Sequence, residues 1–214
     1  MASFLFPPMF KRLLPAIVLV ALGTAIVLAF GGTHVPAPNP DPNHTHADFL
    51  VMLDGQAVDF TDPFFQTGES TVDHTRDESV PAIRKFLHLH DGLGHVIHRH
   101  KPGLMLQDFF DSISVGFTAE CILYTDPAIE RDTACSEHPW RMVVNGQERP
   151  FSLDYDFADG DKILVSTATD DATLKAEWDT MTDDACRYSR TCPWRGDPPT
   201  ENCIADPTVP CMGV

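Results

Sequence analysis

Positive charge is scarce in this chain. It has 15 Lys and Arg residues against 31 Asp and Glu residues, and Lys11 and Arg12 are the only charged residues among the first 30. The chain after residue 30 therefore has 13 basic against 31 acidic residues, a formal charge of −18. Such a charge repels phosphate backbones, which argues against a nucleic-acid partner and makes cations the natural small ligands. High net charge also keeps exported domains soluble, so it does not by itself establish a cation site.

Familiar catalytic motifs are also missing. The sequence contains no G-x-S-x-G, no Gly-rich phosphate loop and no H-E-x-x-H. Hydrolase and kinase interpretations therefore lack support. A bound metal ion with an open coordination position would allow hydration or redox chemistry, but no residue pattern points to it. The sequence favours a binding protein over an enzyme, and we predict no catalytic residue.

One long apolar segment, Leu13 to Phe30, contains no charged residue. As a helix it would span roughly 27 Å at about 1.5 Å per residue, close to the thickness of a bilayer core. Lys11 and Arg12 precede it, and positive residues stay on the cytoplasmic side. We therefore predict a cytoplasmic N-terminus at 1–12 and a transmembrane anchor at 13–32. The protein would be a single-pass protein of the cell membrane with its globular part extracytoplasmic.

A cleaved signal peptide is the alternative, because Ala29-Phe30-Gly31 offers small residues to a signal peptidase. The apolar segment exceeds the usual core of about 7 to 15 residues in a signal peptide, which favours a retained anchor. Export is predicted either way. Beyond the anchor we expect a Pro-rich spacer at 33–42, one domain at 43–169 and a Cys-rich tail at 170–214.

All six cysteines follow the apolar segment, and their even number predicts disulfides in an oxidising compartment. Two of them would close a loop in the domain, and the other four would cross-link a tail of low hydrophobicity. A four-cysteine zinc site in the tail is the alternative, but its spacing lacks the C-x-x-C pairs of zinc ribbons. The cysteines are Cys121, Cys135, Cys186, Cys192, Cys203 and Cys211.

Two apolar segments are each interrupted by a strong hairpin turn signal. Asp54-Gly55 lies within 49–60 and Asn145-Gly146 within 141–151. Between them, apolar residues at helical spacing predict a helix of about three turns, bracketed by Pro102 and Gly116. A closing strand is expected at 162–167. These elements predict an α+β fold, a mixed sheet with one packed helix.

The order of hairpin, helix, hairpin and closing strand resembles a β-grasp domain. The likeness is strongest from Trp140 to Ser166, where MVVNG and DYDFADGDKILVS are similar to the end of β-grasp modules in exported and sulfur-carrier proteins. Sulfur carriers need a C-terminal Gly-Gly that this chain lacks after its last strand, so carrier activity is not implied. In addition, the ordered motifs HTHADFLVMLDGQAVDF, FLHLHDGLGHVIHRH, LQDFFDSI, VVNG and DGDKILVS resemble a family of uncharacterised single-span membrane proteins of archaea and uncultured bacteria. That resemblance implies a membrane anchor and an exported His-rich, β-grasp-like domain.

Five of the ten histidines lie within the 13 residues HLHDGLGHVIHRH. Side chains two residues apart on a strand share a face, so a His-x-His pair can direct two imidazoles at one metal ion. His88 with His90, and His98 with His100, have this spacing. A third pair, His44 and His46, opens the first predicted strand. An inserted His-rich hairpin is therefore predicted, with the two pairs of the segment on adjacent strands.

Whether these two pairs converge depends on the loop between them. An odd loop, Asp91 to Leu93, puts both pairs on one face. An even loop, Asp91 to Gly94, opposes His90 to His95 and turns the second pair away. Leu87 and Leu89 alternate with the histidines, which favours convergence.

Three or four neutral imidazoles suit copper or zinc. We therefore predict a membrane-anchored extracytoplasmic module that captures, buffers or transfers one of these ions, with an unknown protein partner. Its predicted ligands are His88, His90, His98 and His100, with His44 and His46 as auxiliaries, and Asp48, Asp91 and His95 as residues that orient them. The alternatives are a disulfide-stabilised interaction or adhesion domain without metal, and a pH sensor in which protonated imidazoles strain the hairpin.

Overall fold

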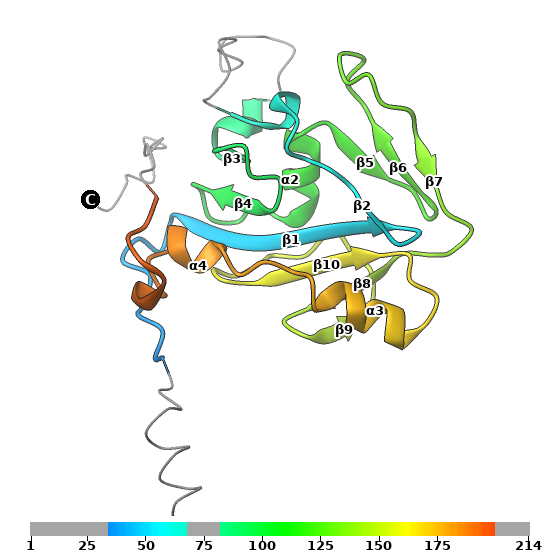
Figure 1. Ribbon diagram of the computed structural model, residues 1–214. Helices are drawn as coiled ribbons and strands as arrows, with labels where there is room; N and C mark the ends of the chain where they lie inside the picture. The colour runs from blue at the N-terminus through cyan, green and yellow to red at the C-terminus, as the bar shows by residue number, and fades with distance from the viewer. Residues whose placement is uncertain (1–33, 68–81, 200–214) are drawn as a thin grey trace, which may run out of the picture. The chain divides into compact units, whose positions relative to one another are not determined.

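A computed structural model describes residues 34–67 and 82–199 of the chain (Figure 1). The chain divides into two compact units, Met1–Val35 and Pro36–Val214, and the fold below is that of the second unit. Among the described residues, no helix is long and apolar enough to cross a membrane. The predicted anchor at 13–32 lies outside these residues, as do Cys203 and Cys211.

A seven-stranded mixed sheet forms the centre of this unit. Its strand order is β3-β4-β1-β10-β8-β9, and β2 pairs with the end of β1. The central strands β1 and β10 run parallel, whereas the other neighbours are antiparallel. The predicted α+β class with a mixed sheet is therefore confirmed. The strands are β1 (Thr45–Leu53), β2 (Gln56–Ala57), β3 (Leu87–His88), β4 (Val96–Arg99), β8 (Arg141–Val144), β9 (Gln147–Arg149) and β10 (Lys162–Ser166).

Both predicted two-residue hairpin turns are confirmed. Asp54 and Gly55 have φ angles of 48° and 76°, and Asn145 and Gly146 have φ angles of 51° and 77°. Positive φ at both central positions is the geometry that matches the right-handed twist of the flanking strands, and Asp, Asn and Gly tolerate it best. These turns set the register of β1 with β2 and of β8 with β9.

Helix α2 (Leu106–Ser112) covers one face of the sheet with its aromatic side chains. The ring centroids of Phe109 and Phe49 lie 5.0 Å apart, and both side chains are buried in the main core. Burial of each such side chain contributes about 1.5–3 kcal/mol. The helix has about two turns rather than the three that we predicted. Met105 is extended and donates its backbone N–H to Asp108, which begins the helix, and Ser114, with a φ of 59°, follows its end.

A smaller sheet follows α2 and consists of β5 (Val115–Phe117), β6 (Cys121–Tyr124) and β7 (Ala134–Cys135). Cys121 and Cys135 are directly opposite each other in the β6–β7 register and form a disulfide. This bond closes the loop that the sequence predicted. Phe117 contacts Trp140 and so joins the small sheet to the main core.

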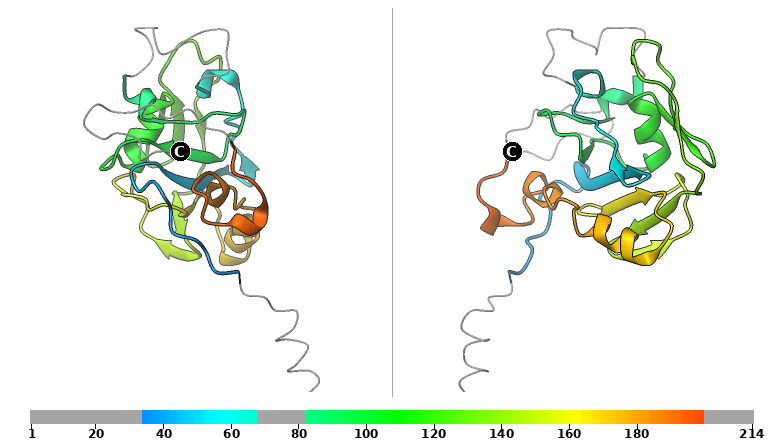
Figure 2. Two further views of the ribbon diagram at one scale, coloured as in Figure 1. Left: turned by 90° about the vertical axis from the view of Figure 1, so that its left-hand side faces the viewer. Right: turned by 45° about the vertical axis from the view of Figure 1, so that its right-hand side comes forward.

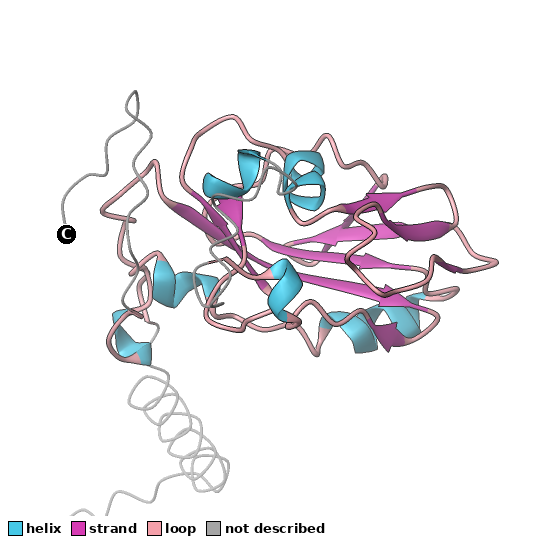
Figure 3. Ribbon diagram, turned by 90° about the horizontal axis from the view of Figure 1, so that it is seen from above, coloured by secondary structure: helices cyan, strands magenta, loops and turns pink. Residues whose placement is uncertain are grey.

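The first part of the predicted tail folds onto the opposite face of the main sheet (Figures 2 and 3). Helix α3 (Asp171–Trp178) packs Leu174 against Leu164, and helix α4 (Ala185–Tyr188) packs against Val96. A second disulfide, Cys186–Cys192, connects α4 to the 3₁₀ helix Pro193–Arg195. The sheet is thus covered on both faces, and the other 3₁₀ helices are Pro63–Phe65 and Ala82–Lys85.

Candidate metal centre

Three neighbouring strands bring the three His-x-His pairs to the face of the sheet that α4 covers. In the β1–β4 register His46 is opposite His98, and in the β3–β4 register His88 is opposite His98. Directly opposite residues project from the same face. The structure therefore places both pairs of the hairpin on one face, as the alternative with an odd loop predicted. The loop between β3 and β4 is longer than the Asp91 to Leu93 of that alternative. We call the six residues the histidine cluster: His44, His46, His88, His90, His98 and His100.

The alternating residues of these strands face the other way, into the core under α2. Leu87, Leu89 and Ile97 are fully buried there. On the histidine side, His46 and His98 have relative exposures of only 1% and 0%. Burial of polar imidazoles is costly unless they find partners, so the cluster is not a solvated polar face.

The rings of the cluster contact one another across the strands. His44 stacks on His100 at 4.0 Å between centroids, and His90 lies 3.7 Å from His98. Tyr188 of α4 packs edge-on against His98 at 4.7 Å. The remaining centroid separations within the cluster are 4.5 Å for His44 and His46, 4.8 Å for His46 and His98, 4.9 Å for His88 and His100, 5.7 Å for His88 and His90, and 6.1 Å for His88 and His98.

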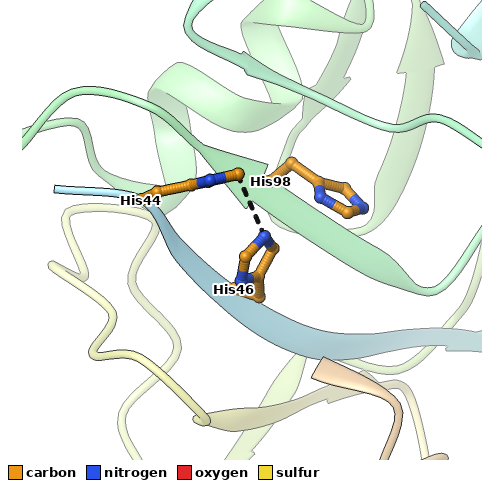
Figure 4. Close-up of side chains that lie close together, drawn as sticks. All are labelled: His44, His46 and His98. Atoms are coloured by element: carbon orange, nitrogen blue, oxygen red, sulfur yellow. Dashed lines mark hydrogen bonds between the residues drawn. The ribbon is translucent and has the colours of Figure 1, made fainter. Parts of the chain in front are cut away.

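His44, His46 and His98 form the group best placed to hold a metal ion (Figure 4). Each offers one ring nitrogen, and these three atoms lie within 4.8 Å of one another. The Nε2 atoms of His44 and His46 are 3.1 Å apart. Two nitrogens on a tetrahedral zinc ion, each about 2.0–2.1 Å from it, would be roughly 3.3 Å apart. The His44–His46 spacing thus already suits a shared ion, and we call this group the first triad.

In three histidines of the cluster, a contact at the ring nitrogen Nδ1 orients the imidazole. The Ser189 hydroxyl donates to the Asp159 carboxylate, so its oxygen accepts from Nδ1 of His46 at 2.8 Å. These two hydrogen bonds place the proton of the His46 ring on Nδ1 and leave the lone pair on Nε2. In metal sites, a carboxylate that does not bind the ion commonly orients a ligand imidazole through hydrogen bonding. In hydrolase triads Ser donates to His, whereas here His46 donates to Ser189, which does not activate the serine.

The other two oriented rings are those of His88 and His90. Nδ1 of His88 donates to the Arg84 carbonyl at 2.7 Å, and Nδ1 of His90 lies 3.0 Å from the Asp91 carboxylate. Since a carbonyl oxygen can only accept, Nδ1 of His88 carries the proton and Nε2 has the lone pair. Asp91 thus contacts a cluster imidazole, and its role in orienting a metal ligand stays a prediction.

Asp48 and His95 contact the tail rather than the cluster. The Asp48 carboxylate accepts from Thr182 Oγ1 at 2.6 Å and from the backbone N–H groups of Asp184 and Ala185 at 2.9 and 3.0 Å. Burial raises the pKa of this carboxyl above its ordinary value, although these three hydrogen bonds act in the opposite direction. His95 Nε2 lies 3.0 Å from the Asp184 carboxylate. Both residues therefore dock α4 onto the histidine face instead of orienting a ligand as we had predicted.

Sequence reasoning missed four residues of the site. They are Arg84, Asp159, Tyr188 and Ser189. Ser189 is 143 residues from His46 in the sequence, and no local motif links them. Only the predicted closure of the tail by cysteines pointed to an ordered segment in that region.

The fold and the site define an α+β domain with a buried histidine cluster that could hold a metal ion and, in the part of the chain that the structure describes, two disulfides. Comparison with known protein families, with curated proteins and with solved structures finds no match for this chain.

Proposed function

We propose that this protein is a metal-binding module that captures, buffers or transfers a copper or zinc ion. The first triad carries this proposal, because its three nitrogens lie within 4.8 Å of one another, with His46 and His98 on two paired strands and His44 directly before the first of them. A rigid sheet holds such ligands more precisely than a loop does. Three protein ligands would leave a fourth tetrahedral position for water or for a ligand from a transfer partner.

The donor set selects the class of ion. Imidazole nitrogens suit zinc and copper, whereas calcium and magnesium prefer oxygen ligands. The acidic protein would also attract the cation before the histidines bind it, because the whole chain has a formal charge of −16. Binding should weaken at low pH because protons compete with the metal for imidazole.

We further propose that the module works outside the cytoplasm, anchored through residues 13–32. Two disulfides among the described residues support an oxidising compartment, and the apolar segment with Lys11 and Arg12 before it supports the anchor. A β-grasp relationship belongs to the same proposal. It is supported by the β1–β2 hairpin, β10 parallel to β1, the β8–β9 hairpin beyond β10, and α2 across one face. Membership in the family of single-span archaeal and bacterial proteins would agree with the export, the anchor and the β-grasp relationship.

The test is binding of zinc or Cu(II) to the chelator-treated full-length protein, measured by calorimetry and by thermal melting. We expect saturable binding and a rise in melting temperature, both smaller in the His44→Ala, His46→Ala double variant, which lacks two ligands of the first triad. His138 is exposed and lies outside the cluster, so His138→Ala is the matched control. No binding by the folded wild type would refute the proposal and leave an interaction domain without metal as the better interpretation.

A further inference from the structure

The histidine cluster contains more imidazoles than one ion can use. A zinc ion usually takes four ligands, whereas the cluster has six histidines, one of each pair on β1, β3 or β4 and the other just beyond the end of that strand. The pair that begins on β4 lies between the pair that ends on β1 and the pair that begins on β3. Ions bound on the two sides of β4 could therefore each use one outer pair and one histidine of the middle pair.

We propose that the cluster holds two metal ions. This inference rests on the proposed function, which assigns the first ion to the first triad. The second ion is bound by what we call the second triad, which is His88, His90 and His100. Each triad then combines an outer His-x-His pair with one imidazole of the middle pair, His98 on β4 for the first ion and His100 just after β4 for the second.

Ring spacing places His88 close to the two other members of the second triad. Imidazoles on one tetrahedral ion have centroids roughly 5 Å apart, given metal–nitrogen bonds of about 2.0–2.1 Å. His88 lies 5.7 Å from His90 and 4.9 Å from His100. The matching distances in the first triad are 4.5 Å for His44 and His46 and 4.8 Å for His46 and His98. The second set is thus wider than the first, but it is still close to the spacing of imidazoles on one ion.

Hydrogen bonding prepares His88 and His90 to act as ligands. Their Nδ1 atoms face the Arg84 carbonyl and the Asp91 carboxylate, so Nε2 is the coordinating nitrogen in both. His46 in the first triad is oriented in the same way, through Ser189 and Asp159. Imidazoles oriented through Nδ1 therefore lie on both sides of β4. A single ion would not require them on both sides.

Two acidic groups offset the charge of two neighbouring cations. Asp91 lies beside the second triad, where its carboxylate also accepts from the Tyr188 hydroxyl at 3.0 Å. Asp159 lies beside the first triad behind Ser189. Tyr188 packs against rings of both triads, at 5.5 Å from His46 and 5.7 Å from His90. This residue of the tail thus contacts both sites.

One movement is required for the second ion. Among the described residues, only the first triad has its nitrogens within 4.8 Å, and the His90 ring lies at 3.7 Å from His98. The His90 ring must turn from His98 toward His88 and His100. His90 is the more exposed of the hairpin pair, with 15% of its side chain accessible, so this rotation does not disturb the core.

The experiment is a titration of the full-length protein with Cu(II), in which bound metal is counted and electron paramagnetic resonance is recorded at each step. Two equivalents are expected, and the second should broaden the signal of the first because the outer strands β1 and β3 are only about 10 Å apart. His88→Ala with His90→Ala should retain one equivalent with an unbroadened signal, and so should His44→Ala with His46→Ala. The single variant His90→Ala tests the same loss if the double variant fails to fold.

Three outcomes separate the two proposals. Two equivalents in the wild type and one in each double variant support the second site. One equivalent in the wild type overturns the second site but leaves the proposed function intact. No bound Cu(II) in the folded protein refutes both.

Discussion

Ser189 in the tail accepts a hydrogen bond from Nδ1 of His46 on β1 at 2.8 Å, and it passes this interaction on to Asp159. The tail is therefore part of the histidine site, and it holds a central imidazole in one tautomer and one orientation. Three groups far apart in the sequence cooperate in this contact, so we expect the tail to influence metal affinity.

Ser189→Ala should weaken metal binding about tenfold or more, because loss of an outer-shell partner typically costs 10–100-fold in affinity. The His46 ring would lose its fixed tautomer, and the buried Nδ1–H would lose its acceptor. Calorimetric titration of the variant with zinc measures the change. Ser152→Ala is the matched control, since Ser152 is exposed and its hydroxyl accepts only a local hydrogen bond, from the Asp154 N–H. Equal affinities for the two variants would contradict the orienting role of Ser189.

Removal of the tail disulfide by Cys186→Ser with Cys192→Ser should also reduce metal affinity. The bond holds α4, whose Tyr188 packs on His98 at 4.7 Å. The chain-entropy estimate for so short a loop is about 2 kcal/mol of stability. Cys121→Ser with Cys135→Ser removes the other disulfide, which is on the small sheet away from the cluster. That control should lose stability but keep its zinc affinity, and a similar loss of affinity in both variants would argue against a specific effect of the tail.

Asp48 should make the folded protein less stable as pH rises from acid toward neutral. Its pKa is raised by burial, so the folded state binds this proton more tightly than the unfolded state. The contribution of Asp48 is fully present below the unfolded pKa of about 3.9 and is lost as pH rises through the folded pKa. Asp48→Asn should therefore become more stable relative to wild type as pH increases over this window.

Urea unfolding of the metal-free protein at several pH values measures this difference. The absolute stability of Asp48→Asn is a separate matter, because the variant also changes the acceptor of Thr182, Asp184 and Ala185. Exposed Glu130→Gln serves as the control. A wild type that gains stability over Asp48→Asn as pH rises would show that hydrogen bonding outweighs burial.

Phe109→Ala should destabilise the domain by about 3–5 kcal/mol, the range for truncation of a buried Phe. Phe109 is fully buried and contacts Phe49, Phe110 and the rest of the core under α2. Met105 is 39% exposed at the start of the same helix, so Met105→Ala should change stability by no more than about 0.5 kcal/mol. Denaturant midpoints of the two variants decide the matter, and a small effect of Phe109→Ala would mean that α2 is not central to the core.

The hairpins and closing strand could be predicted because their signals are local. Asp54-Gly55 and Asn145-Gly146 determine their own backbone geometry, and alternating apolar residues determine which face is buried. The histidine pairs were also visible, because a spacing of two places both imidazoles on one face of a strand. The extent of α2 was less predictable, since the apolar spacing continues past both ends, whereas Met105 and Ser114 are not helical.

The assembly of the site depended on long-range packing. Pairing of His46 with His98 requires β1 and β4 to be neighbours, and no local sequence pattern indicates that they are. Asp48 appeared to be an orienting residue because it is close to His46 in sequence, but the alternation of a strand does not determine what covers its face. Helix α4 covers that face, and the buried Asp48 carboxylate binds its N-terminal N–H groups.

X-ray absorption spectroscopy of the zinc-loaded, full-length protein tests the central claim most directly. We predict a first shell with at least three imidazole nitrogens at about 2.0–2.1 Å, and a lower zinc content in the His44→Ala, His46→Ala variant. A first shell made of oxygen ligands, or a double variant that binds as much zinc as the wild type, would contradict a metal centre in the histidine cluster.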